Sequence, residues 1–188
     1  MLALFAARPY EPPTFDRDAS NLDAHLTNTC LQASSPTSPS SRTSDPEPDP
    51  DPLKTEPAHR FWSLPASDLA PEQKEAIFTR ICAVTGELFE AAARAMTVHF
   101  QPLEQAFEVF GLDFLVDAAA TPWLLEVNAF PDFKQTGARL TGVVGGFWRG
   151  VVGRAVLGRL VAGGGAGEGE GEDGMVLVRR VDLGRRWG

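Results

Sequence analysis

Two apolar runs between residues 107 and 128 constrain the fold of this chain more than any other feature. The first, residues 107–117, reads FEVFGLDFLVD, and the second, residues 123–128, reads WLLEVN. Residues 118–122 separate them and end in a proline, which disfavours a continuous strand or helix. Two strand-like runs joined by a short break are typical of a β-hairpin. The sequence therefore predicts an antiparallel pair of strands over this stretch.

Three oxygen-bearing side chains interrupt these apolar runs. Residues two apart on a strand share a face, so Glu126 and Asn128 should point the same way. If Val116 pairs with Trp123 across the turn, Asp113 lies opposite Glu126. A slip of two residues in that register would still leave the two carboxylates diagonal neighbours.

The predicted pairing of two carboxylates has a chemical consequence. Opposed side chains in an antiparallel pair have Cβ atoms about 4.5–5.5 Å apart. Carboxylates at that distance repel each other, so either one takes up a proton or a cation lies between them. With the amide oxygen of Asn128 they form a hard all-oxygen set that suits Mg²⁺, whereas soft metals prefer Cys or His, and none is nearby in the sequence. The competing interpretation, in which each carboxylate simply faces solvent, stays open on spacing alone.

Apolar residues at spacings of three and four predict two helices. Over residues 72–96 they mark an amphipathic helix whose exposed side carries Lys74 and Glu90. A second helix is expected over residues 139–161, although its glycines weaken it. Residues 175–188 predict a C-terminal strand, from MVLV, and then a basic tail.

Two tracts lack the composition of a folded core. Residues 33–60 are rich in Pro and Ser, and they predict a disordered insertion because repeated prolines remove backbone donors and exclude helix. Residues 163–174 are almost entirely Gly, Glu and Asp and predict a flexible spacer. The foldable remainder is residues 1–32, expected to form short strands and loops, and residues 61–162.

The bulk properties argue against several classes of protein. A formal net charge of −8 disfavours direct nucleic-acid binding, which requires a basic face. The segment 140–162 is broken by arginines, which disfavours a membrane span, and no basic region precedes the apolar N-terminus as a secretory signal requires. Two cysteines without CxxC spacing favour reduced thiols. We therefore expect a cytoplasmic protein without a membrane or direct nucleic-acid partner.

Several motifs of this chain resemble those of the tubulin tyrosine ligase family, and they occur in the same order. The motifs are HLTN at 25–28, TCLQ at 29–32, FGLDFLVD at 110–117 and PWLLEVNAFPDFKQTG at 122–137. The second motif and the end of the fourth are most similar to the fungal branch linked to processing bodies. The resemblance covers residues 1–32 and 61–160.

The resemblance implies an α+β, ATP-grasp fold, of which this chain would hold an incomplete C-terminal portion: an antiparallel sheet with packed helices. Members of the family use ATP to convert a carboxylate into an acyl phosphate. The amine of a free amino acid then attacks this intermediate and forms an amide. The implied function is therefore an ATP- and Mg²⁺-dependent amino-acid ligase.

The resemblance also implies roles for single residues. Asp113, Glu126 and Asn128 would be the Mg²⁺ ligands. Thr27 would approach the nucleotide or the incoming amino acid, and Lys134 would reach a phosphate or a carboxylate. No catalytic residue is assigned.

Two departures from the family pattern limit the expected activity. In the family, the lysines that clamp the nucleotide and the residues of the adenine pocket lie upstream of HLTN, in a region that residues 1–188 do not include. In addition, Leu4 stands where the family has an arginine. We therefore expect a ligase fragment that is not active alone. The alternative is a non-catalytic module that keeps the fold to bind tubulin or a ribonucleoprotein partner, such as a processing-body component. The acceptor, tubulin or another protein, and the ligated amino acid stay open.

Overall fold

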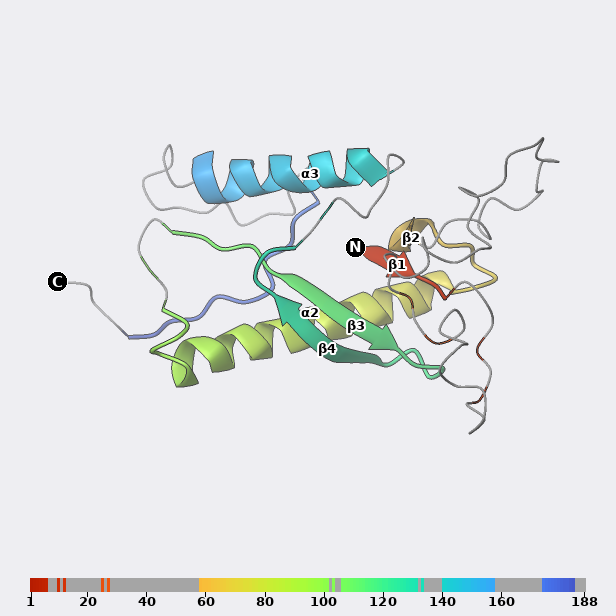
Figure 1. The fold of residues 1–188 in the computed structure, drawn as a ribbon, viewed down its shortest axis with the longest axis horizontal. Helices are drawn as coiled ribbons and strands as arrows, with labels where there is room; N and C mark the ends of the chain where they lie inside the picture. Colours follow the sequence, from red (N-terminus) through yellow and green to blue (C-terminus); the bar gives the residue numbers. More distant parts are fainter. Residues whose placement is uncertain are drawn as a thin grey trace. The chain divides into compact units, whose positions relative to one another are not determined.

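The structure is a computed structural model. It describes residues 1–6, 10, 12, 25, 27, 58–101, 103, 106–131, 133, 140–157 and 174–184. The chain divides into two compact units, Met1–Leu69 and Ala70–Gly188, and each is described by itself. Figure 1 shows the elements, which are helices and small antiparallel sheets, as expected for an α+β fold. Most of the predicted insertion and spacer lies outside the described residues.

The first unit is built on a pair of short strands. β1 (Leu2–Leu4) pairs antiparallel with β2 (Ala58–Arg60), and a 3-10 turn, η5 (Phe61–Ser63), follows directly. His59 in the middle of β2 is buried, and its ring packs against that of Phe5 in a T-shaped arrangement at a centroid distance of 5.7 Å. The last three residues of the predicted insertion are therefore a strand, and that boundary is wrong.

One long helix, α2 (Pro71–Ala95), organises the second unit. Pro71 takes the first helical position, where no N–H donor is needed, and Gln73 Oε1 accepts the N–H of the residue before the helix at 3.0 Å. The helix predicted over residues 72–96 is confirmed. Lys74, however, is only 7 % exposed rather than solvent-facing, because its aliphatic stem can lie along apolar surface.

The predicted hairpin is confirmed. Its strands, β3 (Gly111–Val116) and β4 (Pro122–Asn128), are antiparallel neighbours and lie against α2 (Figure 1). Phe110, just before β3, packs against Phe89 of α2 at a centroid distance of 5.2 Å and against Phe100 at 6.1 Å. These rings anchor the start of β3 to the end of α2. The preceding part of the predicted first run forms no strand, since β4 ends opposite the start of β3 and offers no further partner.

The register of the hairpin differs from the predicted one near the turn. Val116 pairs with Pro122, one residue earlier than predicted, whereas Asp113 pairs with Glu126 as predicted. The register near the turn and the register at Asp113 differ by one residue. They are compatible because β4 contains one extra residue, Leu125, which has no partner on β3 and forms a β-bulge. The prediction for the carboxylate pair is confirmed, and the pairing from which it was derived is wrong.

The second helix of this unit, α3 (Thr141–Val151), continues into a π-helical turn, η8 (Val152–Leu157). This confirms the central part of the helix predicted over residues 139–161. Phe133, which follows β4 in the chain, packs against Phe147 of α3 with the ring centroids 5.4 Å apart. The contact ties the helix to the stretch that leaves the hairpin.

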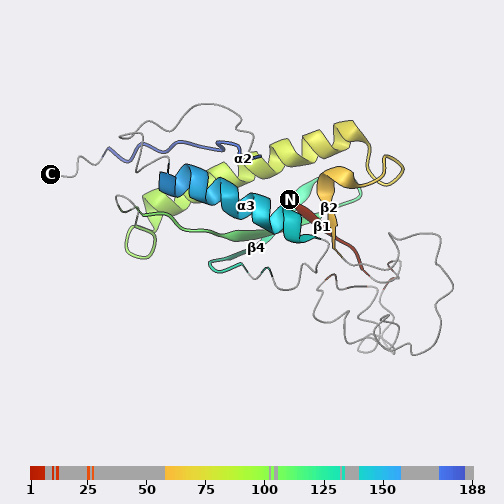
Figure 2. The same ribbon diagram turned by 90° about the horizontal axis from the view of Figure 1, so that it is seen from above.

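The chain near its C-terminus, residues 174–184, is extended and runs beside α2 (Figure 2). It forms no strand, so the strand predicted from MVLV at 175–178 is wrong. The segment contacts helices, whose backbone groups are already paired and offer no edge for a ladder.

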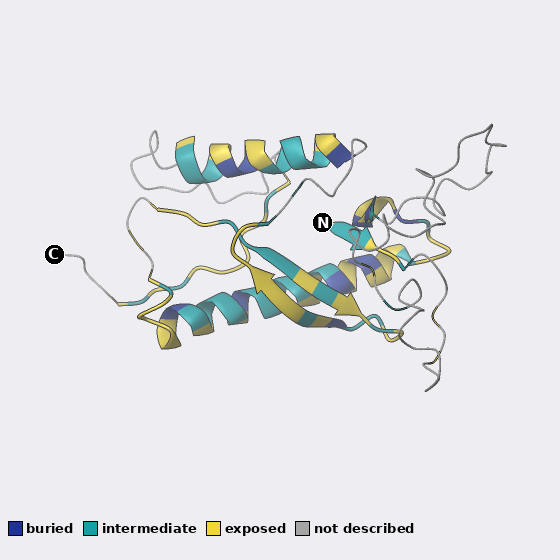
Figure 3. Cartoon of the chain, in the orientation of Figure 1, coloured by how far each residue is buried: buried dark blue, intermediate teal, exposed yellow. Residues whose placement is uncertain are grey.

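The elements carry buried and exposed positions side by side. Figure 3 shows β4 buried at its Pro122 end and exposed towards Asn128, while α2 alternates between buried and exposed positions. In the part of the chain that the structure describes, no helix is long and apolar enough to cross a membrane.

We expect Ala120→Gly to stabilise the protein. Ala120 lies in the hairpin turn with a φ of 58°, a left-handed conformation that glycine adopts without steric cost. Relieving it should gain about 1 kcal/mol in the free energy of unfolding, which corresponds to a rise in Tm of roughly 2–4 °C for a chain of this size. The neighbouring Ala119→Gly, at a position without positive φ, is the matched control and should not raise Tm. Equal thermal shifts in both variants would contradict the assignment of strain to Ala120.

Candidate metal centre

Three oxygen-bearing side chains gather on the hairpin. Asp113 of β3 stands opposite Glu126 of β4, and Asn128 follows on the same strand. The Asn128 amide donates from Nδ2 to Glu126 Oε1 at 3.1 Å and to Asp113 Oδ2 at 3.4 Å. All three residues are exposed. The structure therefore brings together the three residues that the sequence predicted as a group.

The bulge determines which face of the hairpin Glu126 occupies. Phe114, next to Asp113, pairs with Leu124, so this half-buried pair lies on the opposite face from Asp113. An unbroken ladder that continued the register of the turn would pair Asp113 with Leu125 and would turn Glu126 to the face of Phe114. The single extra residue moves Glu126 back to the open face, where its partner is.

Asp117 fixes the turn that sets this register. Its Oδ1 accepts the N–H groups of Ala119 and Thr121, each at 2.9 Å, and its Oδ2 accepts the indole Nε1–H of Trp123 at 2.9 Å. Arg80 of α2 reaches the same turn and donates from Nη1 to Thr121 Oγ1 at 3.4 Å. Sequence analysis gave none of these residues a role. An aspartate at the start of a tight turn that caps the following N–H groups is the signal that could have identified Asp117.

Gly111 lets the chain after β4 return close to the site. A Cβ at this position would lie 3.1 Å from Pro131 Cβ and 3.9 Å from the Cβ of its cross-strand partner Asn128. The first of these distances is tighter than an ordinary van der Waals contact. The absence of a side chain at Gly111 therefore leaves room for Pro131 beside Asn128.

The two carboxylates disturb each other electrostatically. Asp113 is exposed as a residue, but its carboxyl group is partly withdrawn from water. This burial, together with the hydrogen bond and the negative charge of Glu126, raises the pKa of Asp113 above its ordinary value of 3.8. The pair is thus a place where a proton or a cation is favoured.

The donor set fits a hard divalent cation. It consists of two carboxylates and an amide, all of which offer oxygen ligands, and Mg²⁺ in proteins is held by one or two carboxylates. In the described ranges, this site included, no three His, Cys, Asp or Glu side chains gather, so the site offers two carboxylates and one amide. The crowding of Asp113 and Glu126, which a cation would relieve, is the structural observation in favour of Mg²⁺.

The structure does not test the two residues predicted to contact the nucleotide. Thr27 belongs to the first unit and is exposed. Lys134 lies outside the described residues. Both assignments stay predictions.

Asp113 and Asp117 should have opposite effects on the pH dependence of stability. The folded state raises the pKa of Asp113, so its contribution is greatest below pH 3.8 and is lost as the pH rises through the folded pKa. The Trp123 indole and the Thr121 N–H lower the pKa of Asp117, so its contribution is present above pH 3.8 and is lost as the pH falls through the folded pKa. With divalent cations chelated, we expect Asp113→Asn to raise Tm at neutral pH and Asp117→Asn to lower it.

Thermal melts of both variants along a pH series measure this difference. Because a protonated aspartic acid resembles asparagine, both differences from the wild type should shrink in strong acid. Shifts of the same sign at neutral pH would contradict the opposing electrostatic environments.

Comparison with known proteins gives the evolutionary context of this site. Residues 1–159 match the family model described as "Tubulin-tyrosine ligase family". A probable tubulin–tyrosine ligase of Schizosaccharomyces pombe is 40% identical over 157 residues, which are 84% of this chain and 33% of that protein. The probable tubulin–tyrosine ligase PBY1 of Saccharomyces cerevisiae is 38% identical over 148 residues, 77% of this chain and 17% of that protein. The tubulin monoglycylase TTLL3 of Danio rerio is 29% identical over 131 residues, 68% of this chain and 15% of that protein.

The matches confirm the resemblance that the motifs indicated, including the fungal relatives. The chain spans about a third of the Schizosaccharomyces pombe relative and less of the others. Since the family model covers most of its length, this chain belongs to the tubulin-tyrosine ligase family.

Proposed function

We propose that this chain supplies the magnesium-holding part of an ATP-dependent ligase that joins an amino acid to a carboxylate. The observation that carries the proposal is the approach of Asp113 to Glu126 on an exposed hairpin face, with the Asn128 amide in contact with both. Membership of the family supports the ligase class. In this proposal the hairpin and α2 are part of an ATP-grasp fold.

The proposed reaction has two steps. A carboxylate oxygen of the acceptor attacks the γ-phosphorus of ATP, and ADP leaves to give an acyl phosphate. The amine nitrogen of a free amino acid then attacks the acyl carbon, and the amide forms as phosphate leaves and the nitrogen loses a proton. Because the chemistry is phosphoryl transfer, catalysis depends mainly on positioning and on neutralising negative charge.

The residues of the hairpin would contribute to that charge neutralisation. Bound Mg²⁺ would supply positive charge to the β- and γ-phosphates. Asp113 and Glu126 would hold it through carboxylate oxygens. Asn128 would present its amide oxygen after a half-turn of the amide group, whose nitrogen faces the two carboxylates in this structure. The raised pKa of Asp113 would fall again on cation binding, so binding should release protons below neutral pH.

Further assignments rest on the motif resemblance alone. Thr27 of HLTN would approach the nucleotide or the incoming amino acid, and Lys134 would reach a phosphate or a carboxylate. Because the chain spans about a third or less of its matched relatives, the complete reaction and its partners belong to the proposal as well.

The acceptor would be tubulin or another protein. The matched relatives are named as tubulin–tyrosine ligases and a tubulin monoglycylase, so tyrosine and glycine are both candidates for the added amino acid. By the same resemblance, the protein would act in the cytoplasm in contact with processing-body components.

Metal binding by the chain tests the proposal directly. Mn²⁺ takes the same hard oxygen ligands as Mg²⁺, and its paramagnetism allows binding to be followed by electron paramagnetic resonance. We expect Glu126→Gln and Asp113→Asn each to weaken Mn²⁺ binding by at least about tenfold, since each removes a charged ligand. Mg²⁺ should displace the bound Mn²⁺ in the wild type.

Glu108→Gln is the matched control. It removes one carboxylate from an exposed position shortly before β3 and should leave Mn²⁺ affinity unchanged. Wild-type affinity in Glu126→Gln would contradict the metal-holding role. If ATP binding by the chain proved independent of Mg²⁺ and of Glu126, the non-catalytic module that binds tubulin or a ribonucleoprotein would be favoured instead.

A further inference from the structure

Residues 175–184, which we call the C-terminal strap, lie beyond the part of the chain that matches the family. The family match ends at residue 159, and the Gly- and Glu-rich stretch 163–173 separates it from the strap. The strap is extended and has no ladder partner, yet it lies beside α2 (Figure 2). Side-chain contacts therefore hold it in place.

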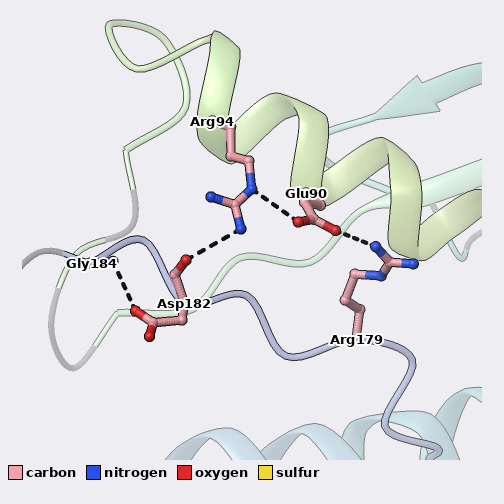
Figure 4. A network of polar contacts seen from close by, with 5 residues as sticks. All are labelled: Glu90, Arg94, Arg179, Asp182 and Gly184. Atoms are coloured by element: carbon pink, nitrogen blue, oxygen red, sulfur yellow. Dashed lines mark hydrogen bonds and ion pairs between the residues drawn. The ribbon is translucent and has the colours of Figure 1, made fainter.

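Charged groups fix the strap at two points along α2. Glu90 accepts a hydrogen bond from Arg94 one turn later in the helix, at 2.9 Å, and forms an ion pair with Arg179 of the strap through its other oxygen. Arg94 also donates from Nη2 to the carbonyl oxygen of Asp182 at 3.3 Å, and Asp182 Oδ1 caps the N–H of Gly184 at 2.8 Å. Figure 4 shows this chain of contacts running from helix to strap and back.

Two helical glycines leave room for the strap. A Cβ at Gly86 of α2 would lie 3.0 Å from Arg179 Nε and 3.3 Å from Arg179 Cβ. A Cβ at Gly150 of α3 would lie 2.7 Å from Met175 Cε and 2.9 Å from Met175 Cγ. Glycine in a helix interior costs about 1 kcal/mol relative to alanine. Packing of the strap against both positions accounts for glycine there, because a larger side chain would meet Arg179 or Met175.

α3 depends on contacts of this kind. Four of its 11 residues are glycine, and isolated helices of this length are marginal even with good helix formers. Phe133 packs on its middle, at Phe147 and Trp148. Met175 packs on its C-terminal end, at Gly150.

We propose that the joint surface of Gly86 and Glu90 on α2 and Gly150 on α3 is a docking site for an extended peptide, and that its occupant is the chain's own C-terminal strap. Arg179 pairs with Glu90 and Met175 covers Gly150, so one short segment bridges the two helices. Docking of the strap fastens α3 to α2. This inference is independent of metal binding at the hairpin.

The methyl groups of methionine report on docking in the full chain. The protein has three methionines, so ¹³C-methyl labelling gives three signals, of which Met1 and Met96 serve as internal references. In the wild type the Met175 signal should differ in position from that of a solvent-exposed methionine. Arg179→Glu, which lies outside the helices and places a negative charge next to Glu90, should move the Met175 signal to the position of an exposed methionine.

Matched variants separate docking from a general loss of structure. Gly150→Ala improves the helix propensity of α3 but should displace Met175. Gly146→Ala should leave the Met175 signal in place, because among the described residues its Cβ would meet only Arg149 Nη2, at 3.8 Å. Glu90→Arg combined with Arg179→Glu reverses this ion pair and should move the Met175 signal part of the way back to its wild-type position, because Arg94 loses its contact with Glu90. Glu87→Arg, one turn before Glu90 on the exposed side of α2, should have no effect.

Amide hydrogen exchange tests whether the strap fastens α3. Exchange over residues 141–151 should accelerate at least about tenfold in Arg179→Glu, because loss of about 1.4 kcal/mol of local stability corresponds to that factor. Exchange in the N-terminal part of α2 around Ile77, which is fully buried, should not change. A Met175 signal at the exposed position in the wild type would overturn the docking, and unchanged exchange in α3 would overturn the fastening.

Discussion

The hairpin must satisfy two registers at once, and the bulge at Leu125 makes this possible. The turn, clamped by Asp117 and held to α2 through Arg80, sets one register. The approach of Asp113 to Glu126 needs a register shifted by one residue. Because a one-residue shift turns every later side chain to the other face, the same strand directs the buried Pro122 and the half-buried Leu124 to one face near the turn and Glu126 to the other face beyond the bulge. The open arrangement of the candidate site therefore depends on one unpaired residue.

The hairpin places two aspartates in opposite electrostatic environments. Asp117 supports the fold of the turn, whereas Asp113 belongs to the candidate site. Asp117 receives three N–H donors, so its negative charge is satisfied by the protein and stabilises the fold at neutral pH. Asp113 faces another carboxylate and, within the described part of the chain, shares with it only the amide of Asn128, so its charge is poorly compensated. A side chain whose charge lowers the stability of the fold is tolerated where the surrounding structure is stable enough to compensate for it. The clamped turn provides that support directly next to the site.

The residues of the candidate site could be grouped from the sequence, but the β-bulge and the turn that bring them together could not. Alternation and spacing were sufficient to predict α2 and the hairpin. They also placed Asp113 opposite Glu126, although through a register that is wrong at the turn. The bulge was missed because one extra residue leaves the composition of β4 strand-like and changes only its pairing. The strand expected from MVLV at 175–178 failed for a different reason: local propensity favoured β structure, but a strand also needs an edge, and this segment meets helices instead. The pairing of strands and the docking of the strap depend on contacts between residues far apart in the sequence. The periodicity of apolar residues contains no information about such contacts.

The glycines of α3 show how contacts with residues distant in the sequence determine the effect of low helix propensity on the stability of a helix. Of the residues that the structure describes, only the side chain of Arg149 lies near Gly145 and Gly146, so an alanine at either position would fit with small adjustments and should favour the helix. Gly150 differs because Met175 occupies the space where its side chain would be. A helix that is weak by propensity gains its order from what packs against it, and the segment packed at Gly150 is joined to the family domain by a Gly- and Glu-rich stretch. Local helix stability and docking of the strap are therefore coupled: strengthening the helix at Gly150 would remove the contact that secures its end.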